Sequence, residues 1–124
     1  QPYLLGTLGV CLRYQGELSR AEEYHREALR LHTSPIQQGV ENMRLGVVLR
    51  EQGNFTEARQ VFLEASTLGD TISTAGTKAE WARLEAQAGN SAEASALYSQ
   101  SIALHQELGN SLEIEKLEKE REAL

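Results

Sequence analysis

Cysteine, aspartate and lysine are scarce in this sequence of 124 residues. Cys11 is the only cysteine, so the chain can form neither an internal disulfide nor a metal site made of cysteines alone. We expect Cys11 to pack as a small apolar side chain. Three lysines stand beside nine arginines, and the formal net charge is -6. Because affinity for nucleic acid comes from clustered Lys and Arg, we expect no nucleic-acid partner.

Long apolar runs and targeting segments are also missing. No run approaches the roughly 20 apolar residues that a membrane span needs, and no signal-peptide pattern is present. We therefore expect a cytoplasmic protein with no membrane partner. The sequence begins with Gln1 and leads almost directly into a helical pattern, which suggests a piece of a larger protein.

The negative charge is confined to the second half of the chain. Residues 1–62 carry seven acidic and seven basic side chains, whereas residues 63–124 carry eleven acidic and five basic ones.

Residues 45–68 show the pattern that repeats through the chain. Apolar residues recur three and four apart on both sides of Gly53, which predicts two amphipathic helices joined by a glycine turn. These residues are Leu45, Val48 and Leu49 before the glycine and Ala58, Val61, Phe62, Ala65 and Leu68 after it. Neither helix can bury its apolar stripe alone, so the hairpin must pack against other helices.

Two further copies of this hairpin are present. When residues 45–68 are aligned with the chain 37 residues earlier, the matching positions are Leu8, Gly9, Leu12, Gly16, Ala21, Ala28 and Leu31. When they are aligned 36 residues later, the matching positions are Gly89, Asn90, Ala94, Tyr98 and Leu104. The third copy differs at Glu85, which replaces a leucine, and at Ser101, which replaces an alanine. The small residues allow helix axes to approach closely.

Seven helices are predicted, over about residues 2–15, 19–32, 36–52, 56–68, 74–88, 91–108 and 111–124. Ser19 with Glu22 reads as a capping box, and Thr56 and Ser111 are the expected caps of their helices. The Ser/Thr-rich stretch after Gly69 is expected to be the softest connection.

This pattern resembles the tetratricopeptide repeat family, whose units combine a large apolar residue, a small residue, a turn glycine and two alanines. The resemblance implies an all-α fold: a right-handed superhelical stack of three antiparallel helical hairpins plus a C-terminal capping helix. It implies one domain over 1–124, with units at about 2–35, 39–72 and 75–108 and a closing helix at 111–124. The longer units are similar to those of signal-transducing ATPase regulators and kinesin light chains.

The closing helix has three interpretations. It is a polar lid over the third unit, the start of a fourth unit, or a frayed and solvated tail.

No catalytic, metal or cofactor site is indicated. His32 and His105 occupy equivalent repeat positions at helix ends, where an imidazolium suits the helix dipole, and His25 lies at a packing position. No two histidines have the four-residue spacing of a helical metal site. Nothing resembles a nucleophile with its base, so we expect no enzyme and no cofactor.

The remaining candidate surface is the concave groove that the first helix of each unit lines in this family. Carried over from the resemblance, its residues are Tyr3, Thr7, Val10, Arg13, Tyr14, Met43, Arg44, Val47, Arg50, Glu51, Glu80, Arg83 and Gln87. Four arginines with tyrosines, valines and a methionine suit an acidic peptide that has an apolar anchor. The alternative is that these are ordinary solvated helix residues.

Two functions follow from the resemblance. The first is a non-catalytic protein–protein interaction module that binds a peptide or a partner domain in its groove. The second is the sensor or regulatory arm of a signal-transducing ATPase or transcriptional regulator, which binds a small effector or a neighbouring domain. Exposed apolar residues near Leu4, Leu5 and Leu8 also predict self-association.

Overall fold

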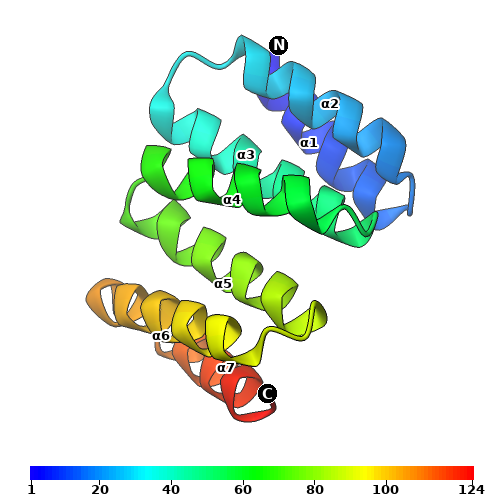
Figure 1. Ribbon diagram of the computed structural model, residues 1–124. Coiled ribbons are helices and arrows are strands. Elements are labelled where there is room, and N and C mark those ends of the chain that lie inside the picture. Colours follow the sequence, from blue (N-terminus) through cyan, green and yellow to red (C-terminus); the bar gives the residue numbers. More distant parts are fainter. The chain divides into compact units, whose positions relative to one another are not determined.

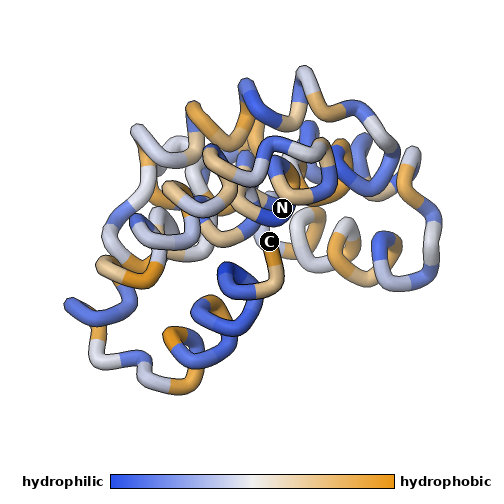
Figure 2. Tube along the Cα trace, turned by 60° about the horizontal axis from the view of Figure 1, so that its bottom comes forward, coloured by the Kyte–Doolittle hydropathy of each residue, from blue (hydrophilic) through white to orange (hydrophobic).

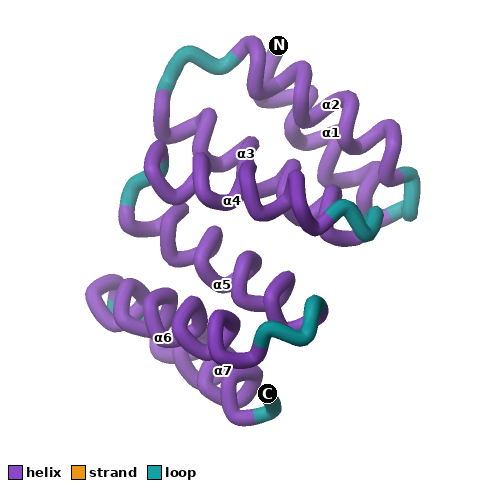
Figure 3. Tube along the Cα trace, viewed as in Figure 1, coloured by secondary structure: helices purple, strands orange, loops and turns teal.

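The computed structural model describes all 124 residues, and its regular secondary structure is entirely helical (Figures 1 and 3). The seven helices are α1 (Pro2–Tyr14), α2 (Leu18–Leu31), α3 (Pro35–Glu51), α4 (Phe55–Leu68), α5 (Thr71–Gln87), α6 (Ser91–Leu108) and α7 (Ser111–Glu122). The predicted all-α class and the organisation in helical hairpins are confirmed.

The chain forms two compact units. Unit 1, Gln1–Gly69, holds the hairpins α1/α2 and α3/α4, which meet through α2 and α3. Unit 2, Asp70–Leu124, holds the hairpin α5/α6 and the helix α7, which packs against α6. Within each hairpin the two helices run antiparallel (Figure 1).

Each hairpin turns on a glycine with a left-handed backbone. Gly16, Gly53 and Gly89 have φ of 81°, 82° and 84°. The following N–H donates back to the carbonyl five residues earlier, as in Asn54 N to Leu49 O at 2.8 Å. This bond closes the first helix, and the second helix begins almost at once. The predicted glycine turns are confirmed.

In both hairpins of unit 1, a glycine on the first helix lies under a ring on the second. Gly9 faces His25, and Gly46 faces Phe62. A Cβ added at either glycine would stand within 3 Å of the ring. A small side chain at this position therefore sets the distance between the two helices.

Each unit has its own apolar core. In unit 1, Leu12, Ala21 and Val48 form a buried cluster with Leu18 and Tyr24 packed against it. In unit 2 one cluster joins α5, α6 and α7, and its buried members are Ala79, Ala82, Ala94, Leu97, Tyr98, Ile102 and Leu117. The helix α7 is therefore docked rather than frayed.

Three predicted capping residues were wrong, because Glu17, Asn54 and Asn110 occupy the cap positions. The helices α2, α4 and α7 begin at Leu18, Phe55 and Ser111, so Ser19, Thr56 and Ser111 lie inside the first turns instead of capping them. The reason is the glycine turn, which delivers the chain straight into the next helix, so that the residue after the glycine becomes the cap.

The stretch after Gly69 was also predicted wrongly as a soft connection. The helix α5 begins at Thr71, because the Asp70 side chain accepts a hydrogen bond from Ser73 N at 2.9 Å and caps it. The hydrogen bond from the backbone N–H of Ser73 lowers the pKa of Asp70 most, and the bond from the Ser73 hydroxyl lowers it further.

Cys11 was expected to be packed, but it is exposed. The buried stripe of α1 is Gly6, Gly9 and Leu12, and Cys11 lies beside it. The neighbouring leucines Leu4 and Leu8 are 57% and 39% exposed, so self-association through this part of α1 stays a prediction.

Candidate functional site

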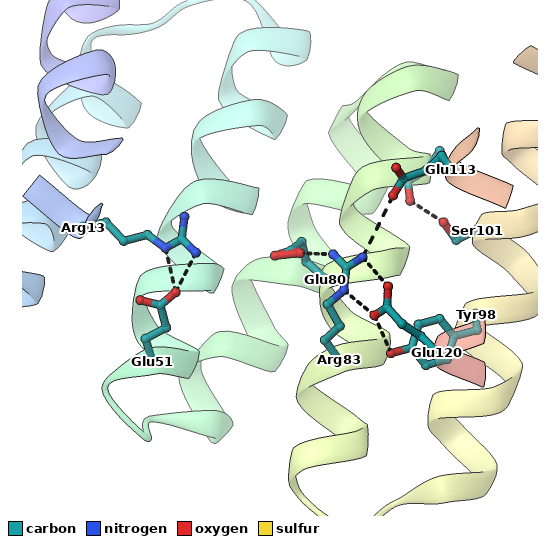
Figure 4. Close-up of polar contacts among 9 residues, drawn as sticks. Arg13, Glu51, Glu80, Arg83, Tyr98, Ser101, Glu113 and Glu120 are labelled. Atoms are coloured by element: carbon teal, nitrogen blue, oxygen red, sulfur yellow. Dashed lines mark hydrogen bonds and ion pairs between the residues drawn. The ribbon is translucent and has the colours of Figure 1, made fainter. Parts of the chain in front are cut away.

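The groove residues of unit 1 come from α1 and α3, and one ion pair joins the two helices. Arg13 donates from Nε and Nη2 to Oε1 of Glu51, each at 2.7 Å (Figure 4). Both side chains are about three-quarters covered, with 26% and 31% exposed. Desolvation lowers the pKa of Arg13, but the hydrogen bond and charge of Glu51 outweigh it and raise that pKa. Two predicted groove residues are thus brought together, and each satisfies the other.

Tyrosines lie near both ends of α1. The Tyr14 ring is 78% exposed, and the Arg13 guanidinium lies over it at 5.1 Å from the ring centroid. Tyr3 is 56% exposed and meets His32 edge-on, with 4.9 Å between ring centroids. Thr7 donates its hydroxyl to the Tyr3 carbonyl. Tyr14 is therefore an open aromatic surface beside a cation.

Arg44 takes part in a buried polar cluster that the sequence did not reveal. It donates to Glu41 Oε1 at 2.8 Å, and Glu41 Oε2 lies 2.9 Å from His25 Nδ1. Glu41 and His25 are buried, whereas the Arg44 side chain is 36% exposed. A Cβ at Gly6 would stand 2.2 Å from Glu41 Oε1, so α1 closes over the cluster.

Helical spacing could have identified Glu41. It lies four residues before Leu45, on the stripe that continues to Val48, and all three are buried. Helical spacing can therefore predict that a carboxylate is buried, but it cannot predict which side chain neutralises that carboxylate.

The other unit 1 candidates differ in exposure. Val47 is 6% exposed and belongs to the core, not to an open groove wall. Val10, Met43 and Arg50 are partly buried. The apolar residues available to a ligand on this face are therefore Val10, Met43 and the tyrosines.

In unit 2 the candidate residues Glu80 and Arg83 are held by α7. Arg83 donates from Nε and Nη2 to the two oxygens of Glu120, at 2.8 and 3.0 Å, and from Nη1 to Glu80 (Figure 4). Glu113 Oε1 lies 4.0 Å from Nη2, and the Tyr98 hydroxyl donates to Glu120 at 3.2 Å. Arg83 is thus surrounded by three carboxylates. Gln87, the third candidate on α5, is exposed.

The hydrogen bonds between Arg83 and Glu120 shift the pKa of both groups. They lower the pKa of Glu120, with the Arg83 charge and the Tyr98 hydroxyl contributing in the same direction against desolvation. They also raise the pKa of Arg83. Both groups are charged at neutral pH, and the bidentate geometry is the strongest form of such a pair.

The two departures of the third repeat have local explanations. Glu85 is 3% exposed and accepts from Trp81 Nε1 at 3.0 Å and from Asn90 Nδ2 at 2.8 Å. Ser101 is fully buried and donates to the Ala75 carbonyl at 2.7 Å. Both polar groups are satisfied, so they fit the core.

The histidines do not assemble a metal site. His32 ends α2 and His105 lies in the last turn of α6, and both are buried. No three His, Cys, Asp or Glu side chains are grouped so that they could hold a metal ion. None of the seven helices has the combination of length and apolar character that a membrane crossing requires.

Comparison with known families identifies the first two hairpins. The family model described as tetratricopeptide repeat matches residues 3–34 and 43–68. The chain belongs to the tetratricopeptide repeat family. Tetratricopeptide repeats are generally protein-interaction modules, typically without catalytic activity. A search of curated proteins found no match to the chain. The matched segments contain the glycine turns at Gly16 and Gly53 that define each tetratricopeptide hairpin here.

Proposed function

We propose that unit 1 binds an acidic peptide segment of a partner protein, extended or helical, on the face that α1 and α3 form. The observation that carries this proposal is the guanidinium of Arg13 lying between an open aromatic ring, Tyr14, and a carboxylate, Glu51. A cation beside an exposed ring is a common arrangement at protein interfaces, which are enriched in Arg and Tyr.

The chemistry of Arg13 fits a carboxylate ligand. Guanidinium has five N–H donors, and Glu51 takes Nε and one Nη2 donor through a single oxygen. The remaining donors can meet a second carboxylate, which would compete with Glu51 for the same cation. The ring of Tyr14 offers an apolar contact next to this position, so an acidic residue beside an apolar one is the expected ligand pattern.

The family supports a protein or peptide as the ligand class, and the predicted groove residues of unit 1, with three arginines beside Glu51, favour an acidic one. Arg44 and Arg50 are the predicted groove cations of α3, and Arg44 is engaged by Glu41. We therefore assign the main contact to Arg13 and Tyr14 and a supporting one to the half-buried Val10 and Met43.

Acidic peptides selected from a library against the wild-type chain would test this function. Arg13→Gln and Tyr14→Ala should each weaken binding about tenfold or more, because one charge-assisted bond or one aromatic anchor is lost. Raising the salt concentration should weaken binding further.

Arg30→Gln is the matched control. Arg30 lies at the end of α2, is well exposed and pairs only with the neighbouring Glu27 in the same helix. It should bind the selected peptides like the wild type. Equal affinity of all three variants would show that the face of α1 and α3 is not the ligand site.

A further inference from the structure

The helix α7 presents two different faces. Glu113, Ile114, Leu117 and Glu120 follow one another at helical spacing on the face that meets α5 and α6. Leu117 is completely buried there, whereas Leu112 is 82% exposed. Figure 2 shows how hydrophilic the rest of this helix is, next to the C-terminal label.

The receiving face on α5 and α6 combines an apolar floor with one cation. Ala79, Leu97 and Ile102 belong to the cluster that covers Leu117. Arg83 and the Tyr98 hydroxyl bind Glu120 at the edge of this floor, and Glu113 approaches from the other end. The face therefore recognises two glutamates seven residues apart with apolar residues between them.

The attachment of α7 is slight for a packed helix. Leu117 is the one buried residue in its twelve. The connection to α6 is Gly109, in the left-handed conformation, and Asn110, which caps α7. A helix held by one leucine, a partly buried isoleucine, a charge cluster and an exposed hydrogen bond from Arg121 to Ser99 can leave and return without disturbing the hairpin beneath it.

The sequence of α7 also differs from that of the first helix of a hairpin. At the repeat position where α1, α3 and α5 have Gly9, Gly46 and Ala82, α7 has Glu118, which is exposed. Gly9 and Gly46 each lie under a ring of the next helix, and a glutamate at this position leaves no room for a ring. By its sequence α7 is suited to be a bound helix, not half of a hairpin.

We infer that the face of α5 and α6 around Arg83 is a binding site for an acidic amphipathic helix of a partner protein, and that α7 is its resident occupant. A partner helix with the pattern Glu-Ile-x-x-Leu-x-x-Glu displaces α7 and takes over its contacts. The site lies within unit 2 and uses none of the residues assigned above to α1 and α3. It shares with the proposed function only the acidic character of the ligand, so either can hold without the other.

The test uses the full chain and a labelled peptide with the sequence of residues 111–124. Leu117→Asn with Glu120→Gln loosens α7 in the chain while the peptide keeps both native side chains. The loosened chain should bind the peptide at least tenfold more tightly than the wild type, because in the wild type α7 competes at high effective concentration. Adding Arg83→Gln to the loosened chain should weaken binding by about tenfold or more.

Two peptides provide the matched controls. A peptide with Leu112→Asn changes the exposed side of the helix and should bind like the native one, whereas Leu117→Asn in the peptide should abolish binding. Equal binding of the wild-type and loosened chains, or binding that does not depend on Arg83, would overturn the inference.

Hydrogen exchange of the wild-type chain keeps the test decisive if the loosened chain does not fold. The amides of α7 should exchange faster than those of α5 and α6, and excess peptide should accelerate α7 alone. If α7 exchanges only together with α5 and α6, it is a permanent part of the core and the inference fails. The same holds if a dimer forms by exchange of α7 between copies, since the occupant is then a second chain.

Discussion

The ring of Phe62 lies directly on Gly46: a Cβ built on that glycine would stand 2.4 Å from Phe62 Cε1. Both residues are buried, Phe62 completely. Real Cβ atoms do not approach a ring carbon this closely, so the distance between α3 and α4 depends on the absence of one carbon atom. His25 stands over Gly9 in the same way in the hairpin α1/α2.

Gly46→Ala is therefore expected to destabilise the chain despite the better helix propensity of alanine. Overpacking costs about 1–3 kcal/mol, and the propensity gain of about 1 kcal/mol offsets part of it. Urea unfolding would measure the change. Combined with Phe62→Leu, which removes part of the ring, Gly46→Ala should cost less than it does alone. Strict additivity of the two substitutions would contradict this contact.

Ala58→Glu should destabilise the chain strongly, because Ala58 is fully buried at a helix contact. A buried carboxylate without a partner costs about 3 kcal/mol or more. The melting temperature by circular dichroism would report it. Thr56→Glu on the exposed side of the same helix is the control and should melt like the wild type. If Ala58→Glu had the same melting temperature as the control, the assignment of Ala58 to a helix contact in the repeat would be wrong.

Arg44→Glu should also destabilise unit 1, although the sequence indicates Arg44 only as a groove residue. The substitution brings a second carboxylate against the buried Glu41 and removes its cation. We expect a loss of about 2 kcal/mol in the free energy of unfolding, reduced from a fully buried pair because Arg44 is partly exposed. Arg30→Glu, at an exposed pair, should change stability little. Similar urea midpoints for the two variants would mean that Arg44 does not stabilise Glu41.

Acid should release α7 before it unfolds the hairpins. The pKa of Glu120 is lowered in the folded chain, first by the hydrogen bonds from Arg83, so its ionised form favours docking. This contribution is present above the ordinary carboxyl value of 4.5 and is lost as the pH falls through the lower folded value. Hydrogen exchange of α7 should therefore accelerate below about pH 4 in the wild type.

In Glu120→Gln, α7 should exchange fast at every pH, so the acceleration by acid should disappear. In Glu115→Gln, acid should accelerate the exchange of α7 as in the wild type. Glu115 pairs only with Lys119 on the exposed side of α7, where both side chains are more than two-thirds exposed. If α7 in the wild type exchanges at the same rate at pH 3 and pH 7, after correction for intrinsic exchange, Glu120 does not hold it.

The repeating hairpins could be predicted from sequence because their signals are local. A turn glycine, a small residue and an apolar stripe act within one helix or one turn, and Gly53 and Gly46 lie where their spacing indicates. The starts of α2 and α4 were missed by one residue, because the residue directly after the turn glycine occupies the cap position.

Polar partners could not be predicted because they depend on distances between helices. Nothing near Arg83 in the sequence indicates that Glu120, 37 residues later, supplies a bidentate carboxylate. Glu41 and Glu85 are buried carboxylates, and the sequence does not indicate that His25 and Trp81 are their partners. The predicted groove thus contains arginines as expected, but Arg13, Arg44 and Arg83 are already engaged by carboxylates of the same chain.

The turn positions require a residue that can adopt a left-handed backbone conformation, but they have room for a side chain. A Cβ on Gly53 would meet nothing within 4 Å, and the φ of 82° is the only obstacle to a side chain there. An amino acid of D configuration favours that angle, so D-alanine at this position would fit the turn as it stands. In a chemically assembled chain it would also restrict the unfolded state and stabilise the hairpin, where L-alanine would strain it.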